Sequence, residues 1–544
     1  MTKRDSTADS SDSADSRARQ ARARSSGQPA KPLAGVLFDM DGVITDTADA
    51  HAAAWKRLFD EYLAARPERG GEDHEPFDRE SDYRAYVDGK PRYDGVASFL
   101  EARGIELPHG DPSDPPELET ICGLGNRKDG YFTQWLRDNE VRRYPTTVAL
   151  IEDLRAADIR TAVFSSSRNC EAVLREAGVH DLFDTRVDGN DLARLELPGK
   201  PDPAILHEAA ARLGLSPDAT AVVEDSVAGV EAGARGGYRP VVGIDRGNYG
   251  HALHEAGADI VVRDPGELRL DPDRTLVTRR LHTLPSARGH LADIQARIGD
   301  RTPALFLDYD GTLTPIVTDP AAADLGQRMR SVLDRLAQHM PVAIISGRGL
   351  DDLQRRVGLD AVIYAGSHGF ELRGPRFEET AKHAEAFLPG LDSAEAALRQ
   401  RLANIEGVLI ERKPFAIAVH YRRAAASAVD SVEAEVDAVV CGQRGLRKRH
   451  GKKVFQVQPR LDWDKGHAVT RLLERLEPER GEYIPIYIGD DLTDEDAFRA
   501  LAGRGLTIAV RDGERATAAD YGLEDTSDVE SFLAELSAHA DAEQ

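Results

Sequence analysis

The chain contains two copies of one short pattern, an apolar run that ends in Asp-x-Asp-Gly. The first copy is VLFDMDG (residues 36–42) and the second is LFLDYDG (residues 305–311). A short apolar run that stops at a polar turn is typical of a strand buried in a parallel sheet. Ligands gather beyond the carboxyl ends of such strands. The repeated pattern therefore predicts two sheets, each with a crevice beside its acidic turn.

Both acidic turns are followed, in the same order, by a serine, a lysine and a further aspartate. These are Ser165, Lys200 and Asp225 in the first half and Ser346, Lys465 and Asp490 in the second. The step from the lysine to the last aspartate is 25 residues in both halves. The longest gap, however, precedes the serine in the first half and follows it in the second. Strand-like runs alternate with helical stretches throughout, so we expect two related α/β cores with a domain-sized insertion at different places.

Length and composition suggest how these cores are distributed along the chain. At 544 residues the chain is too long for one core. Its first thirty residues have almost no large apolar side chains and are predicted to be disordered. The segment between the two cores mixes proline, glycine and charge, as a linker does. We expect a tail over 1–30, a first domain over 31–265 with an insertion at about 50–145, a linker over 266–300, and a second domain over 301–538 with an insertion at about 372–460.

Charge and cysteine usage exclude several classes of function. Asp and Glu number 94 against 70 Lys and Arg, for a net charge of −24, so we expect no nucleic-acid partner. No run approaches the roughly 18 apolar residues of a membrane helix, and the N-terminus lacks the apolar core of a signal peptide. We therefore expect no membrane partner. The three cysteines are isolated from one another, which argues against a disulfide framework or zinc site and predicts a cytoplasmic setting.

The residue types in each set suit the transfer of a phosphoryl group. Three carboxylates at one point repel one another unless a hard cation such as Mg²⁺ neutralises them. A serine beside a helix N-terminus, together with a lysine, suits a bound phosphate. We predict that Asp39 and Asp308 are nucleophiles and that Asp41 and Asp310, two positions later, move the proton.

Taken in order, these motifs resemble the haloacid dehalogenase superfamily of aspartate-dependent phosphatases and phosphomutases. The resemblance extends from about Leu33 to about Leu536. It implies an α/β fold class with two Rossmann-like parallel-sheet cores, the first with a helical cap and the second with an α/β cap.

The second half resembles the trehalose-6-phosphate phosphatases. The segments that carry the resemblance are LFLDYDGTLTPI (305–316), IISGR (344–348), YAGSHGFEL (364–372), IERKPFAIAVHYR (410–422), DWDKGHAV (462–469) and YIGDDLTDEDAF (487–498). The resemblance implies Mg²⁺-dependent hydrolysis of trehalose 6-phosphate, with the metal held by Asp308, the Asp310 carbonyl and Asp490. It implies that phosphate and sugar are bound by Ser346, Gly347, Arg348, His368, Glu411, Lys413 and Lys465.

Two features of this half leave alternatives open. Glu411, Lys413, His420 and Arg422 either read sugar hydroxyls or form the polar face of a cap strand, and His368 either faces the crevice or is a structural turn residue. The segment VFQVQP (454–459) also departs from the family pattern Val-x-Glu-x-Arg-Pro. Gln456 can hydrogen-bond a hydroxyl, but unlike the glutamate of the family pattern it cannot form an ion pair.

The first half resembles β-phosphoglucomutase and its near relatives. The segments are VLFDMDGVITDTADAHAAAWKRLFDEY (36–62), FSSSRN (164–169), PGKPDPAI (198–205) and VVEDSVAGVEAG (222–233). The resemblance implies Mg²⁺ ligands Asp39, Asp41 and Asp225, phosphate-binding residues Ser165, Ser166 and Lys200, and substrate residues Thr47, His51, Arg92 and Lys128. The last two would bind a distal phosphate, as in β-glucose 1-phosphate chemistry.

The activity of this first half stays open between a mutase and a phosphatase. Arg92 and Lys128 favour a mutase, which needs a second phosphate site. Asp88 argues against it, because a mutase usually has a lysine at this position. A third alternative is a module without turnover that serves regulation or docking.

Overall fold

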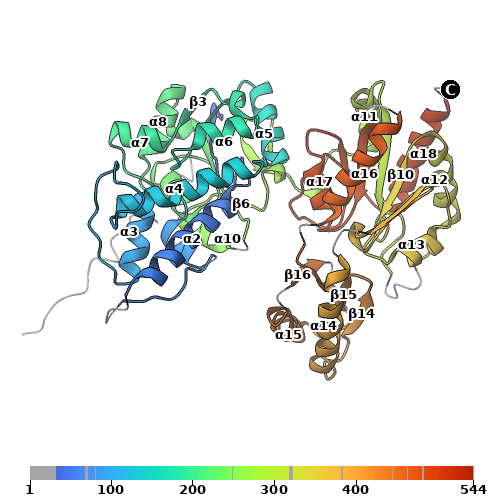
Figure 1. Cartoon of the computed structure of the whole chain (residues 1–544). Helices are drawn as coiled ribbons and strands as arrows, with labels where there is room; N and C mark the ends of the chain where they lie inside the picture. The colour runs from blue at the N-terminus through green and yellow to red at the C-terminus, as the bar shows by residue number, and fades with distance from the viewer. Residues whose placement is uncertain are drawn as a thin grey trace, which may run out of the picture.

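The computed structural model describes residues 32–67, 72–79, 81–247, 249–317, 323–380, 384–443, 445–451, 453–461, 463–480 and 483–542. The tail predicted over residues 1–30 lies outside these ranges. Figure 1 shows two α/β modules, the first in blue to green and the second in yellow to red. No helix in the described ranges is long and apolar enough to cross a membrane.

The first module is built on a parallel sheet with β1 at its centre, between β2 and β4. Alternate residues of β1 pack into separate cores on the two faces, Val36 and Phe38 into one and Leu37 into the other, as expected for a doubly covered sheet. In spatial order the strands are β3 (Thr185–Val187), β2 (Arg160–Phe164), β1 (Gly35–Asp39), β4 (Thr220–Glu224), β5 (Val241–Ile244) and β6 (Ile260–Val262).

Helices follow the strands of this sheet and cover it. They are α5 (Pro145–Ala156), α6 (Cys170–Glu176), α7 (Gly189–Leu195), α8 (Ala204–Leu213), α9 (Val227–Arg235) and α10 (Gly250–Ala256).

A helical cap is inserted between β1 and β2. Its elements are α2 (Ala48–Ala65), the π-helical turn η1 (Tyr83–Val87), α3 (Arg92–Ala102) and α4 (Ile121–Asp138). They enclose an aromatic core of their own, in which Phe59 contacts Trp55, Phe77 and Phe99. The predicted helical covering of the first crevice is therefore present.

The second module has an eight-stranded sheet with β9 between β10 and β18. Neighbouring strands pair in parallel except at one edge, where β12 pairs antiparallel with both β11 and β13. In spatial order they are β13 (Phe377–Thr380), β12 (Glu371–Gly374), β11 (Ile363–Gly366), β10 (Val342–Ile345), β9 (Thr302–Asp308), β18 (Tyr483–Gly489), β19 (Leu506–Val510) and β20 (Tyr521–Leu523). The helices of this core are α11 (Leu291–Ile298), α12 (Gln327–His339), α13 (Leu350–Val357), α16 (Lys465–Arg480), α17 (Glu495–Ala500) and α18 (Thr526–Ala542).

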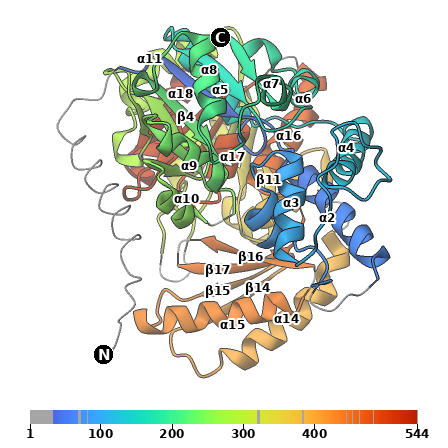
Figure 2. The ribbon, with the colours of Figure 1, turned by 90° about the vertical axis from the view of Figure 1, so that its left-hand side faces the viewer.

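The cap of the second module is an antiparallel sheet backed by two helices. Its strands, in spatial order, are β14 (Leu409–Lys413), β15 (Ala416–His420), β17 (Val454–Pro459) and β16 (Leu446–Gly451), and its helices are α14 (Leu388–Arg401) and α15 (Val429–Cys441). Figure 2 shows both helices on the sheet face turned away from the core. The predicted insertion began at about residue 372, but β12 and β13 extend the core sheet by pairing with β11. The cap elements therefore begin later, at α14.

The segment predicted as a linker, residues 266–300, is folded throughout and packs on both modules. It contains the hairpin β7 (Leu268–Leu270) and β8 (Leu276–Thr278), and it ends in α11. Leu268 and Leu276 belong to a core of the first module, whereas Leu281 and Leu284 belong to a core of the second.

Candidate active sites

The second crevice forms where neighbouring parallel strands end. Asp308 is the last residue of β9, Ser346 follows β10, and Asp490 follows β18. Because β10, β9 and β18 are adjacent in the sheet, their carboxyl ends bring these side chains together. Lys465, the first residue of α16, completes the predicted set.

Three buried carboxylates gather at this point. One oxygen each of Asp308, Asp490 and Asp494 lies within 4.8 Å of the others. Lys465 Nζ lies 2.6 Å from Asp308 Oδ1 and 2.7 Å from Asp494 Oδ1. Burial raises the pKa of Asp308 well above its usual range, against the opposing effect of Lys465. One lysine cannot balance three carboxylates, and this set of hard oxygen donors fits Mg²⁺.

Sequence reasoning missed Asp494 as a member of this cluster. Its Oδ2 accepts hydrogen bonds from the backbone N–H groups of Asp490 (3.0 Å) and Asp491 (2.8 Å). Its Oδ1 accepts from the Tyr487 hydroxyl at 2.6 Å. Asp494 therefore shapes the loop that carries Asp490. The only signal in the sequence was the density of acidic residues in GDDLTDED.

The glycine after each acidic turn is required by the turn itself. Gly311 has φ +97°, and a Cβ there would lie 2.2 Å from Asp490 Oδ2. Gly42 has φ +78°, and a Cβ there would lie 1.8 Å from Asp225 Oδ2. Glycine alone combines this left-handed backbone with so close an approach.

Asp310 lies beside the carboxylate cluster but its side chain is held by Arg348. The guanidinium donates to both Asp310 oxygens, from Nε at 2.7 Å and from Nη2 at 2.6 Å. Arg348 Nη1 also lies 3.2 Å from Asp352 Oδ2. Arg348, which was predicted to bind phosphate, therefore forms an ion pair with Asp310, the predicted proton carrier.

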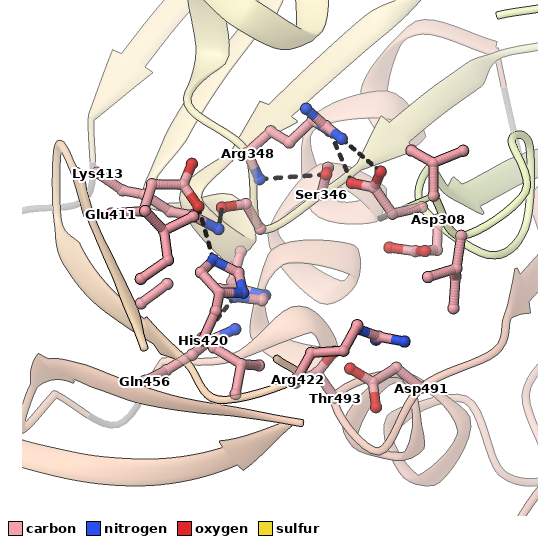
Figure 3. Close-up of a pocket in the computed structure, with 18 of the residues that line it drawn as sticks. Asp308, Ser346, Arg348, Glu411, Lys413, His420, Arg422, Gln456, Asp491 and Thr493 are labelled. Atoms are coloured by element: carbon pink, nitrogen blue, oxygen red, sulfur yellow. Dashed lines mark hydrogen bonds and ion pairs between the residues drawn. The ribbon is translucent and has the colours of Figure 1, made fainter. Parts of the chain in front are cut away.

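The cap supplies the opposite wall of a pocket of about 380 Å³. Figure 3 shows polar side chains of the cap strands facing Asp308, Ser346 and Arg348 of the core. Three contacts order this wall: His420 Nε2 with Glu411 Oε2 at 2.9 Å, Lys413 Nζ with the Gly347 carbonyl at 2.7 Å, and His368 Nε2 with Gln456 Oε1 at 2.9 Å.

His368 thus lies in the crevice, on a turn with φ +59°. Burial lowers the pKa of His368 well below its usual range, and Lys465 and Lys413 add to this shift. The ring is therefore neutral, and Nε2–H donates to the Gln456 amide oxygen.

The first crevice repeats the buried lysine and carboxylates. Lys200 Nζ lies 2.6 Å from Asp39 Oδ1 and 3.2 Å from Glu224 Oε1. Oxygens of Asp39, Glu224 and Asp225 lie within 4.8 Å of one another. This set also fits Mg²⁺, and sequence reasoning missed Glu224, whose signal was its place before Asp225 at the end of β4.

The predicted proton carrier of the first crevice is linked to the cap. Thr47 Oγ1 donates to Asp41 Oδ1, and His51 Nε2 lies 3.4 Å from the same oxygen. Lys128 Nζ in turn lies 2.6 Å from His51 Nδ1. Burial alone would raise the pKa of Asp41, but His51 and Thr47 outweigh it and hold that pKa below its usual range. Burial lowers the pKa of Lys128 to about 8.

The rest of this crevice is a pocket of about 510 Å³ between core and cap. Arg92 Nη1 forms an ion pair with Asp129 Oδ2 at 2.7 Å. Asp129 also accepts from Asn169 Nδ2 at 2.9 Å, so the cap and the serine loop are joined. Ser165 and Ser166 line the same pocket. Asp88 lines it too, and burial, with Glu224 nearby, raises the pKa of Asp88 to about 7.

Comparison with known proteins agrees with this two-module layout. A model of the trehalose-phosphatase family matches residues 306–527, and a model of haloacid dehalogenase-like hydrolases matches residues 33–237. The chain is 38% identical over 397 residues to a trehalose-phosphate phosphatase of Mycobacterium marinum, covering 72% of this chain and 93% of that protein. The chain belongs to the trehalose-phosphatase family. The predicted resemblance to haloacid dehalogenase enzymes, with its α/β fold class, is confirmed.

The chain is also similar to a longer protein and to a solved structure. The chain is 40% identical over 511 residues to a Mycobacterium tuberculosis protein named uncharacterized glycosyl hydrolase MT2062. The match covers 92% of this chain but 38% of that longer relative. The solved structure of a β-phosphoglucomutase from Clostridium difficile is similar, with 25% identity and a TM-score of 0.36, over 44% of this chain and 93% of that one.

Proposed function

We propose that the second crevice hydrolyses trehalose 6-phosphate to trehalose and phosphate in a Mg²⁺-dependent reaction. The observation that carries this proposal is the buried cluster of Asp308, Asp490 and Asp494 around Lys465, beside a pocket whose cap wall carries polar side chains. Family membership supports the same reaction.

The residues divide the chemistry as follows. Asp308 attacks phosphorus, the bond from phosphorus to the sugar oxygen breaks, and an aspartyl-phosphate forms. Asp310 gives a proton to the leaving sugar oxygen, which becomes a hydroxyl. Asp310 then takes a proton from the water that attacks phosphorus, so that the bond from Asp308 to phosphorus breaks and phosphate leaves. Lys465 and the Ser346 hydroxyl hold the phosphoryl oxygens. Asp308, Asp490 and the Asp310 carbonyl would hold Mg²⁺, which when bound would withdraw charge from those oxygens.

The cap decides which sugar enters. Glu411 and His420 form a hydrogen-bonded pair, and Gln456 presents an amide beside them. A carboxylate accepts hydrogen bonds from sugar hydroxyls, whereas imidazole and amide groups can both donate to them and accept from them. A site built from such groups rejects analogues that lack the matching hydroxyl, because its own polar atoms are then left unpaired.

For the first crevice we propose sugar-phosphate chemistry of the mutase or phosphatase kind, with β-glucose 1-phosphate as the candidate substrate. The buried chain from Asp41 through His51 to Lys128 supports it, because it links the proton carrier to a cap cation. Arg92 lies in the same pocket and suits a second phosphate. A silent docking module has no need of Asp39, Asp41, Lys200 and Asp225 together.

One experiment separates the alternatives for the second crevice. Phosphate release by the full chain is measured with trehalose 6-phosphate and with glucose 6-phosphate at equal concentrations. We expect clear preference for the disaccharide in the wild type and in Asp39→Asn, and no release from trehalose 6-phosphate in Asp308→Asn. Equal rates with both sugars would instead indicate a generic sugar-phosphate phosphatase.

A second experiment addresses the first crevice. Asp308→Asn protein is mixed with β-glucose 1-phosphate, Mg²⁺ and a trace of sugar bisphosphate. Glucose 6-phosphate as product identifies a mutase, and free phosphate alone identifies a phosphatase. If neither forms, and the double variant with Asp39→Asn behaves alike, the module is silent.

A further inference from the structure

The acidic loop of the second crevice is held from outside the crevice by Arg515. This loop joins β18 to α17 and carries Asp490 and Asp494. Arg515 Nη2 donates to the backbone carbonyls of Asp490 (2.9 Å) and Asp491 (3.4 Å). Its Nη1 forms an ion pair with Glu495, which is 2% exposed. Arg515 therefore fixes the loop backbone through its carbonyls and does not engage the carboxylate of Asp490, which lines the pocket.

The stretch that carries Arg515 is paired with the segment between the two modules. Leu281 N–H donates to the Arg515 carbonyl and Thr517 N–H donates to the Arg279 carbonyl, both at 3.1 Å. Arg280 pairs with Ala516 in an antiparallel bridge. The backbone that sets the position of Arg515 is thus shared between the second module and the connecting segment.

A second contact joins α17, the helix that follows the acidic loop, to the connecting segment. Arg499 of α17 donates from Nη2 to Glu267 Oε1 at 3.1 Å, and Glu267 is 5% exposed. Glu267 lies at the start of the connecting segment, in a short turn, η4 (Pro265–Glu267), that packs against α5 of the first module. Helix α5 also contacts α17 directly.

The same helix α17 is tied to the cap. Asp496 Oδ2 accepts from Arg449 Nη1 of cap strand β16 at 2.7 Å, and its Oδ1 lies 3.4 Å from Arg499 Nη1. An alternating series of charges, Glu267, Arg499, Asp496 and Arg449, therefore runs from the connecting segment through the core to the cap. A displacement of Glu267 is therefore expected to shift α17, and with it both the acidic loop and the cap strand that α17 contacts.

We propose that Arg515 and Arg499 are positioning residues of the second crevice and that the connecting segment, with the first module behind it, holds both in place. This inference rests on the phosphatase function proposed above. Residues that orient the ligands of a metal typically change metal affinity or activity by about 10- to 100-fold when they are lost. The first module is then a structural part of the trehalose-phosphatase site, whatever reaction its own crevice performs.

The test compares Arg515→Gln, Arg515→Lys and Glu267→Gln in the full chain. We expect Arg515→Gln to lower kcat for phosphate release about tenfold and to raise the Mg²⁺ concentration for half-maximal rate by a similar factor. Glu267→Gln keeps the shape and one hydrogen bond, so we expect a loss of about threefold by the same reasoning. Arg515→Lys retains one cationic donor and restores part of the rate, because lysine lacks the fork that spans two acceptors.

Arg288→Gln is the matched control. Arg288 lies on the same connecting segment and also pairs with the second module, through Asp528 and Glu535, but it is exposed and does not touch the acidic loop. We expect unchanged kcat and unchanged Mg²⁺ dependence in this variant. Arg515→Gln and Glu267→Gln proteins that keep both quantities within twofold of the wild type would overturn the proposal.

A direct measurement of Mg²⁺ binding separates this proposal from the proposed function. Calorimetric titration with Mg²⁺ is carried out on the Asp225→Asn protein, in which the first crevice is disabled, with and without Arg515→Gln. Weaker Mg²⁺ binding in the double variant supports the positioning role of Arg515 even if no trehalose 6-phosphate is hydrolysed. Equal affinities, with or without turnover, contradict it. If Arg515→Gln does not fold, Glu267→Gln takes its place in both measurements.

Discussion

Lys465 and Asp308 form a buried ion pair, with Nζ 2.6 Å from Oδ1. Lys200 and Asp39 form the same pair at the same distance in the first module. In both crevices a second carboxylate shares the lysine. In both modules the predicted nucleophile is therefore paired with a buried lysine that a second carboxylate shares. The modules differ in their caps.

Removal of the lysine tests this setting. We expect Lys465→Met to lower the free energy of unfolding by about 3–5 kcal/mol, because it leaves the Asp308 and Asp494 charges unpaired. Chemical denaturation without Mg²⁺ measures the loss, and added Mg²⁺ is expected to recover part of it. Lys56→Met is the control, because the Lys56 and Asp60 side chains of its ion pair are 38% and 34% exposed. An equal loss in both variants would speak against a special role for the buried pair.

The turn glycine provides a steric test of the acidic cluster. We expect Gly311→Ala to reduce Mg²⁺-dependent phosphate release by at least about tenfold, since its Cβ would displace Asp490 and its backbone would cost about 1–3 kcal/mol. Gly326→Ala is matched to it, because a Cβ at Gly326 meets nothing within 4 Å. Steady-state rates and melting temperatures of both proteins check the prediction. Normal activity in Gly311→Ala would contradict the close approach of Gly311 to Asp490.

The lowered pKa of Lys128 predicts the pH dependence of anion binding in the first crevice. Lys128 is charged below pH 8 and loses its proton as the pH rises through its pKa of about 8. We expect the affinity of Asp39→Asn protein for a sugar bisphosphate, measured by calorimetry from about pH 6.5 to about pH 9.5, to fall by up to about tenfold per pH unit above that point.

A control variant and a measurement of stability accompany this titration. In Lys128→Arg the guanidinium stays charged, so its affinity should not fall in this range. Between about pH 8 and the ordinary lysine pKa the unfolded chain binds the extra proton, so the contribution of Lys128 to stability should rise with pH. A fall in affinity that is identical in wild type and Lys128→Arg would assign the effect to another group.

Gln456 tests how the cap reads its substrate. We expect Gln456→Glu to lower KM for trehalose 6-phosphate severalfold with little change in kcat, because a charged acceptor binds a hydroxyl more strongly than an amide does. Gln456→Met loses the contact with His368 and should raise KM. Steady-state kinetics decide the matter, and an unchanged KM in both variants would remove Gln456 from the sugar site.

Much of the fold and part of each site could be predicted because their signals are local. The apolar runs before Asp39 and Asp308 specify buried strands, and Gly42 and Gly311 specify the turns after them. The order of serine, lysine and aspartate then places these residues at neighbouring strand ends. The predicted start of the second cap, at about residue 372, was less accurate. The sequence pattern does not show that β12 and β13 extend the core sheet through pairing with β11.

The sequence by itself determined the two acidic turns, the two parallel cores and the residue types that approach each crevice, since all of these follow from short-range patterning. Only the tertiary structure decided that Asp494 and Glu224 join the carboxylate clusters and that Arg348 is held by Asp310. It also decided that Arg515 contacts the backbone of the acidic loop and that Arg499 joins α17 to Glu267 of the connecting segment. These are contacts between segments far apart in the chain, and their partners are set by how the two modules and their caps pack.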